Sequence, residues 1–115
     1  MRIDSDIDQA EISTGADLRL EYRGEPFTGE VVTTVGEQLL SQTFYVDGIP
    51  HGQDREWWAD GVPMAEGRTE HGRPVGTWRR WHHNGQLAVE KQFDSTGDLD
   101  DVRSWDEDGN EIEGG

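Results

Sequence analysis

The feature that most constrains this chain is an internal repeat with a spacing of 24 residues. Residues of the same type recur at this spacing in several sets, which are Trp57, Trp81 and Trp105; Arg55, Arg79 and Arg103; Gly61, Gly85 and Gly109; and Glu66 and Glu90. A unit this short cannot bury an apolar face alone, so neighbouring units must stack against one another. The repeat therefore predicts one continuous array of small identical elements.

The turn chemistry predicts that each element is a β-hairpin. Asp60-Gly61, Asn84-Gly85 and Asp108-Gly109 follow aromatic runs, and such dipeptides favour the two-residue type I′ turn. Two Gly-x-Pro-x-Gly segments, Gly48–Gly52 and Gly72–Gly76, are expected to form the wider connections. Their prolines lack the N–H that a central ladder requires, so we expect them to lie outside it.

Repetition of strand, tight turn, strand and wide turn gives an all-β fold. We expect a single elongated antiparallel β-meander of about eight strands, preceded by a short N-terminal arm. The expected boundaries are 1–21 for the arm, 22–115 for the repeat domain, and 22–45, 46–69, 70–93 and 94–115 for its hairpin units.

Alternation along a strand sorts the side chains into two faces. Arg55 and Trp57 share one face, and the repeat extends this Arg-x-Trp pattern across the sheet. We expect the arginines to stack on the tryptophans or to pair across strands. The opposite face is expected to carry Asp54, Glu56 and Trp58 in one unit and Trp78, Arg80 and His82 in the next.

A single sheet with aromatic side chains on both faces needs cover for one of them. Residues 1–20 supply apolar side chains, and we expect this arm to lie over the sheet. The apolar residues of the arm are Ile3, Ile7, Ile12, Leu18 and Leu20. Within the arm, Asp8–Ile12 is expected to form a short helix that ends at Thr14-Gly15.

The net charge of −15 limits the class of partner. Such a field repels nucleic acid and anionic lipid and attracts basic surfaces. The negative charge reflects either a compositional or salt-adapted bias or attraction of a basic protein.

The chain has no cysteine, which excludes disulfides and thiolate metal sites. Its first eight residues lack the apolar core of a signal peptide, and no stretch approaches the roughly 20 apolar residues of a membrane span; we expect a cytoplasmic protein.

Together, these motifs resemble the MORN repeat superfamily, and more narrowly the MORN-variant YwqK-like antitoxin or immunity proteins. The similar segments are Trp57–Gly61, Trp81–Leu87, Gly72–Trp78 and Tyr22–Gly29, so the resemblance spans residues 22 to about 110. It implies an elongated β-meander that binds and neutralises a toxin encoded nearby. It implies no catalytic residue.

No pattern in the sequence indicates a catalytic, cofactor or metal site. His82 and His83 are adjacent and point to opposite faces of a strand, whereas zinc needs three or four convergent ligands. Ser41 and Ser104 lack a nucleophile-elbow context. The acidic pair Asp100-Asp101 lacks the spacing of a calcium loop. We therefore expect a protein that is not an enzyme.

The candidate partner-binding residues are Trp58, Trp78, Arg80, His82, Glu56 and Asp54. Trp58 and Trp78 do not recur in register, and out-of-register aromatics are typical of interface hot spots. The alternative is that this patch packs under the N-terminal arm. We expect an antitoxin or immunity protein that occludes a basic toxin as a monomer or 1:1 complex, without nucleic acid or membrane. The alternatives are a scaffold or membrane-associated module, and an enzyme or small-ligand binder with a deep cavity.

Overall fold

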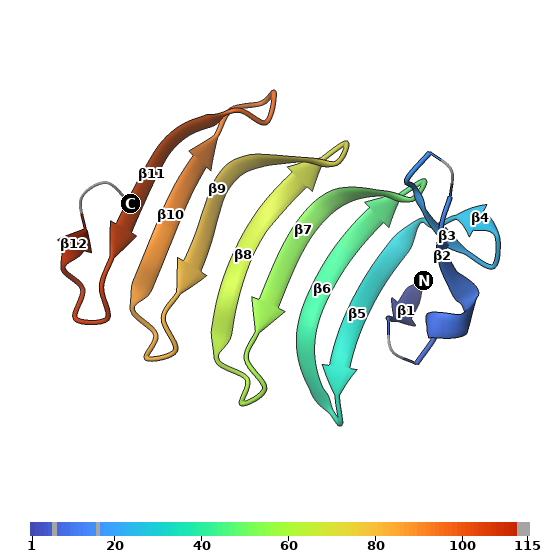
Figure 1. Ribbon diagram of the computed structural model, residues 1–115, viewed down its shortest axis with the longest axis horizontal. Helices are drawn as coiled ribbons and strands as arrows, with labels where there is room; N and C mark the ends of the chain where they lie inside the picture. The colour runs from blue at the N-terminus through green and yellow to red at the C-terminus, as the bar shows by residue number, and fades with distance from the viewer. Residues whose placement is uncertain (6, 16, 113–115) are drawn as a thin grey trace.

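The chain folds almost entirely into β-strands that lie side by side (Figure 1). The computed structural model describes residues 1–5, 7–15 and 17–112, so the expected arm and the fourth unit each include positions outside this description. The elements are β1 (Arg2–Asp4), the 3₁₀ turn η1 (Gln9–Glu11), β2 (Ile12–Thr14), β3 (Leu20–Tyr22), β4 (Glu25–Pro26), β5 (Gly29–Val35), β6 (Gln38–Val46), β7 (Ile49–Trp57), β8 (Pro63–Glu70), β9 (Arg73–Trp81), β10 (Leu87–Phe93), β11 (Leu99–Trp105) and β12 (Glu111–Ile112).

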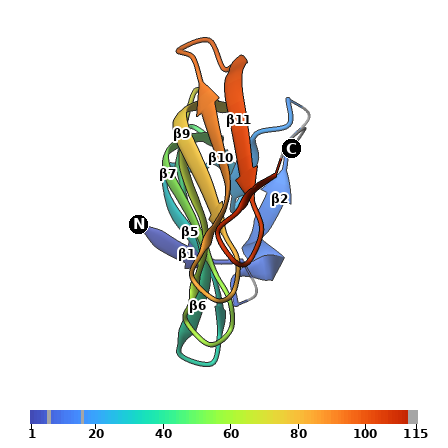
Figure 2. The same ribbon diagram turned by 90° about the vertical axis from the view of Figure 1, so that its left-hand side faces the viewer.

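The main sheet confirms the predicted antiparallel meander. Each strand from β5 to β12 pairs with the next in the chain, and β1 adds a parallel ninth strand beside β5. A second sheet contains only β2, β3 and β4. Seen from the side, β5 to β11 form one twisted layer (Figure 2). The molecule measures 47 × 36 × 19 Å, as a sheet without a second layer should.

In the two middle units of the repeat, the two kinds of turn are the reverse of those expected. Asp47-Gly48 and His71-Gly72 form two-residue turns, and both residues of each pair have positive φ, as type I′ geometry requires. Asp and His enter the left-handed region more readily than most residues. The Asp-Gly pairs instead close wider loops. The Gly61 N–H donates to the Trp58 carbonyl, the Trp58 N–H donates to the Val62 carbonyl, and only Gly61 has positive φ.

The prolines of the Gly-x-Pro-x-Gly segments lie inside the ladder, so the expectation that they stay outside it is wrong. Pro50 is the second residue of β7 and pairs with Tyr45, while its carbonyl accepts a hydrogen bond from the Gly72 N–H at 2.8 Å. Proline lacks only a donor, and its acceptor remains available. The second glycines, Gly52 and Gly76, have positive φ where the pairing register shifts. They supply the β-bulges that bend the strands.

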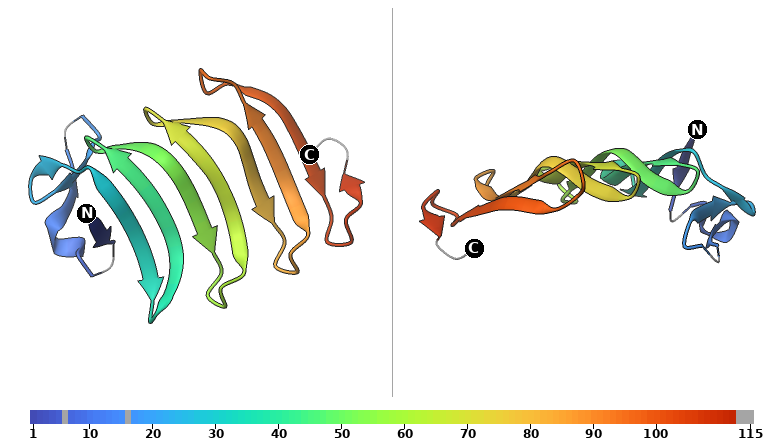
Figure 3. Two further views of the ribbon diagram at one scale, coloured as in Figure 1. Left: turned by 180° about the vertical axis from the view of Figure 1, so that it is seen from behind. Right: turned by 90° about the horizontal axis from the view of Figure 1, so that it is seen from above.

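The N-terminal arm extends the edge of the sheet and does not cover a face, contrary to the expectation. Ile3 of β1 is 2% exposed, but Ile7 and Leu18 are 79% and 84% exposed. The small sheet packs at one end of the layer (Figure 3). There the Leu20 N–H donates to the Gly48 carbonyl, and the Gly48 N–H donates to the Phe27 carbonyl. The expected helix is reduced to the single turn η1, which runs directly into β2.

Few side chains are buried, because one layer has little interior. The buried apolar residues are Ile3, Phe27, Val32, Val75 and Ala88. Stability must therefore depend on contacts between neighbouring strands more than on a central core. Turns that fix the strand register should be correspondingly important.

A comparison of Gly48→Ala with Gly24→Ala tests the junction between the two sheets. Both glycines follow a left-handed residue and have φ near +80°, so each alanine should cost about 1–2 kcal/mol of backbone strain. A Cβ at Gly48 would lie 2.5 Å from the Leu20 carbonyl oxygen, whereas one at Gly24 meets nothing within 4 Å. We expect Gly48→Ala to lower the free energy of unfolding by roughly a further 1–3 kcal/mol in urea denaturation. Equal losses would contradict this contact.

Candidate partner-binding surface

One face of the sheet carries a row of directly paired side chains with alternating charge. Each member of the row lies opposite the next across neighbouring strands. The row runs through Gln42, Arg55, Glu66, Arg79, Glu90 and Arg103. We call this side, together with the in-register Trp57, Trp81 and Trp105, the ladder face. Its arginines come from the strand before each wide loop, and its glutamates come from the strand after it.

Most charges along the ladder face bind one another. Arg79 Nε lies 3.1 Å from Glu90, and Arg79 Nη1 lies 3.8 Å from Glu66. Arg103 pairs with Glu111 at 3.1 Å and places its guanidinium over the Trp105 ring at 5.5 Å. Both expected roles of the arginines, stacking and cross-strand pairing, are therefore present. These exposed pairs are individually weak, but they occupy their charged groups with partners inside the chain.

The opposite face carries side chains that differ from unit to unit, and we call it the variable face. The strand register places two rows of side chains on this face. The first row is Ser41, Glu56, Ala65, Arg80, Val89 and Ser104. The second row has two parts, which are Thr43, Asp54 and Gly67 on β6 to β8, and Trp78, Lys91 and Val102 on β9 to β11. Tyr45 and Phe93 lie on the same face, beside Asp54 and Trp78 respectively. Four of the six predicted binding residues, Asp54, Glu56, Trp78 and Arg80, thus lie on one surface.

Trp78 is held in place on the variable face. Its ring lies directly on the backbone of Gly67, where a Cβ would approach within 2.0 Å of the ring. The indole N–H donates to the Arg68 carbonyl at 3.0 Å, and Phe93 contacts the ring edge-on with centroids 6.5 Å apart. A side chain fixed in this way loses little conformational freedom when a partner covers it.

A shallow hollow of about 290 Å³ surrounds Trp78. Its lining residues come from β7, β8, β9 and β10 and are Glu56, Ala65, Trp78, Arg79, Arg80, Val89 and Lys91. Among the described residues, no ion pair or hydrogen bond engages the side chain of Arg80 or of Lys91. The floor is apolar, and the two cations beside it have no partner among the residues that the structure describes.

An acidic zone adjoins this hollow on β7. Asp54 is half-buried and accepts one long hydrogen bond, 3.4 Å from the Thr43 hydroxyl. Burial raises the pKa of its carboxyl, and the neighbouring Glu56 carboxylate raises that pKa further. Burial and the charge of Asp54 together raise the pKa of Tyr45. No arginine or lysine offsets the Asp54 charge among the ion pairs of the described chain.

The two remaining predicted residues lie in the loops, away from the hollow. Trp58 begins the loop after β7 and contacts the His83 ring edge-on at 5.1 Å, and His83 Nε2 lies 2.6 Å from Asp60. His82 Nε2 lies 2.8 Å from the Trp105 carbonyl oxygen. These contacts join successive wide loops to one another. Neither residue packs under the N-terminal arm, which lies at the far end of the sheet (Figure 3).

Sequence reasoning missed Tyr45, Val89, Lys91 and Phe93 as members of this surface. Tyr45 lies on β6 and the other three lie on β10, and only the cross-strand register places them beside β7 and β9. One local signal was available. Gly67 interrupts an otherwise side-chain-bearing strand, and an isolated strand glycine often marks a close approach by another group. Here that group is Trp78.

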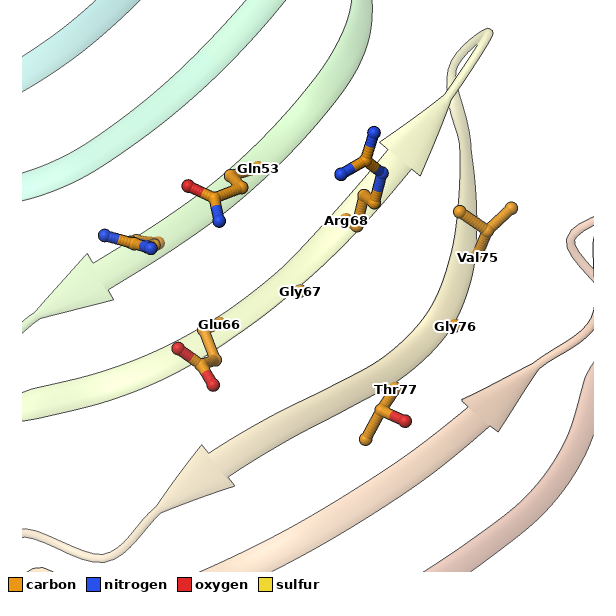
Figure 4. A pocket seen from close by; sticks show the side chains of 8 residues that line it. Gln53, Glu66, Gly67, Arg68, Val75, Gly76 and Thr77 are labelled. Carbon is orange, nitrogen blue, oxygen red and sulfur yellow. The ribbon is translucent and has the colours of Figure 1, made fainter.

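The ladder face has a hollow of its own beside the bulge at Gly76 (Figure 4). It measures about 290 Å³ and is bounded by β7, β8 and β9. Gln53, Glu66 and Arg68 project from β7 and β8 around it, and Val75 and Thr77 close it from β9 (Figure 4). This hollow is open and its lining is polar and apolar in equal parts, and it adjoins the paired row of charges.

Nothing among the described residues gathers three or more metal-ligating side chains. His51 and His71 stack at 5.1 Å, but the His71 N–H donates to Nδ1 of His51, so that nitrogen is already engaged. Within the described chain, no helix is long and apolar enough to cross a bilayer.

Comparison with known proteins gives no significant match to a family model, a curated protein or a solved structure.

A double-mutant cycle tests the packing of Trp78 on Gly67. Gly67→Ala should lower the free energy of unfolding by about 1–3 kcal/mol, because the added methyl group must displace the ring. In a Trp78→Val background, which copies Val102 of the next unit, the same change should cost much less. Urea denaturation of the four proteins measures the coupling. Additive losses would show that the ring does not lie on Gly67.

Proposed function

We propose that this chain is an antitoxin or immunity protein that binds a basic protein toxin and neutralises it by occlusion. The observation that carries the proposal is the variable face. It holds a fixed tryptophan, an apolar floor and charged groups of both signs that form no ion pair among the described residues. Rigid aromatic anchors surrounded by polar groups are characteristic of protein–protein contact surfaces.

The shape of the molecule favours protein contact over catalysis. Small-molecule sites bury most of their ligand in a concave cavity, whereas the hollows beside Gly76 and Trp78 are shallow depressions on an exposed sheet. The variable face between β6 and β10 is broad and has no second layer over it (Figures 2 and 3). A surface of this kind suits a folded partner.

The charge of the chain supports a basic partner. A net charge of −15 on 115 residues produces a long-range negative field, which accelerates association with a cationic protein. The resemblance to YwqK-like antitoxins gives that partner its class, a toxin encoded beside this chain. Occlusion requires only that the bound chain cover the functional surface of the toxin.

The product of the adjacent gene provides the direct test. We expect it to be toxic when expressed alone, to be harmless with this chain, and to bind it with a Kd of micromolar or below. The association rate should fall as NaCl rises from about 0.05 to 0.5 M, because salt screens charges beyond a few ångströms. Surface plasmon resonance measures both quantities. A non-toxic neighbour, or one that does not bind, contradicts the proposal.

A further inference from the structure

Because of the internal repeat, residues that lie 24 positions apart occupy equivalent places in successive units. The two faces of the sheet differ in how far such residues are the same. On the ladder face, two positions recur in three successive units, with arginine at 55, 79 and 103 and tryptophan at 57, 81 and 105, whereas the position of Gln53, Thr77 and Asp101 varies. On the variable face, equivalent residues differ: Asp, Trp and Val at 54, 78 and 102; Glu, Arg and Ser at 56, 80 and 104; and Thr, Gly and Lys at 43, 67 and 91.

This difference has a physical meaning in a repeat protein. Side chains needed to stack one unit on the next must recur in every unit, because every unit makes the same contact. Arg79 and Arg103 meet this requirement through their ion pairs along the ladder face. Side chains that change from unit to unit are not needed for stacking. They give each position along the sheet its own chemistry.

The unit-specific side chains on the variable face form three adjacent zones. Asp54 and Glu56 on β7 are acidic and lie beside Tyr45. Trp78 lies next to them over Gly67. Arg80 and Lys91 follow on β9 and β10 and carry no ion pair among the described residues. The order across the sheet is therefore acidic, aromatic and basic.

We propose that the variable face between β6 and β10 is the recognition surface, and that its occupant is a basic protein with a matching pattern. That protein would bring a lysine or arginine to Asp54 and Glu56, an apolar side chain to Trp78, and a carboxylate to Arg80 and Lys91. The inference rests on the proposed function for the identity of the partner, but not for the choice of face. The ladder face is less suited, since a partner there would have to displace the existing ion pairs of Arg79 and Arg103. A second copy of the chain is also unsuited, because each copy carries a charge of −15.

The free protein carries a cost that this partner would remove. The pKa of Asp54 is raised in the folded state by burial and by Glu56. A carboxyl with a raised folded-state pKa favours folding while it is protonated, and that contribution is lost as pH rises through the folded-state pKa. Above that pKa, the ionised Asp54 therefore opposes folding. A cation from the partner would stabilise the ionised form, so binding should weaken as pH falls through the raised pKa.

Two charge-matched variants test the choice of face with the adjacent gene product. Asp54→Asn and Glu66→Gln each remove one negative charge, from the variable face and the ladder face respectively. We expect Asp54→Asn to raise the Kd by about tenfold and to raise the urea midpoint of the free protein at pH 7. We expect Glu66→Gln to change the Kd by less than about twofold. Equal effects on binding, or a lower urea midpoint for Asp54→Asn, would overturn the inference.

Trp78→Leu and Trp58→Leu form a second matched pair, because Trp58 lies outside the hollow. Trp78→Leu should weaken binding by about tenfold or more, as expected for a central aromatic anchor, and Trp58→Leu should have little effect. The reverse order would move the contact from the sheet to the wide loops and overturn the inference. Circular dichroism of both variants confirms that a loss of binding does not follow from a loss of fold.

A probe that does not depend on the toxin keeps the two proposals separate. Titration with acetyl-argininamide, followed by NMR, should shift the backbone amides of residues 54–56 and the indole N–H of Trp78. The indole signals of Trp57, Trp81 and Trp105 report the ladder face and should shift less. Asp54→Asn should abolish the response. Equal shifts on both faces would overturn the choice of face, whereas failure of the adjacent gene product to bind would overturn only the proposed function.

Discussion

The cross-strand register of the main sheet is the constraint on which the rest of the structure depends. Because the molecule is a single layer 19 Å thick, it has few buried side chains to fix the strands in place. The row from Gln42 to Arg103 provides an alternative, since each arginine faces a glutamate only in one register. A slip by one residue would move the entire row to the other face. Turns and bulges maintain the same register at both ends of the strands.

That constraint divides the surface into two parts with different roles. On the ladder face, Arg79 and Arg103 bind carboxylates of the same chain, whereas Arg55 forms no ion pair among the described residues. The variable face is left with a fixed Trp78, a half-buried Asp54 and cations without partners in the described chain. A protein that presents unpaired charge around a rigid aromatic group is prepared for a partner at some expense to its own stability. Such a compromise is common where binding and folding make opposite demands.

Some sequence predictions succeeded because they depended on local chemistry, and others failed because they did not. The 24-residue spacing gave the antiparallel meander, and alternation placed Arg55 and Trp57 on one face. The type of each turn was wrong, because Asp-Gly suits both a type I′ turn and a type I turn with a bulge. The position of the arm was also wrong. Its isoleucines indicated burial, but backbone pairing between β1 and β5 drew it to the sheet edge.

The sequence by itself determined the repeat, the alternation of faces and the excess of acidic residues. Each of these follows from spacing along the chain or from composition. Only the tertiary structure decided which side chains from different strands are neighbours. It placed Lys91 beside Trp78, Asp54 beside Tyr45, and Trp58 away from the hollow with which it was grouped. The physical reason is that neighbours across a sheet are set by bulges such as those at Gly52 and Gly76. One residue inserted into one strand changes the pairing of every residue beyond it.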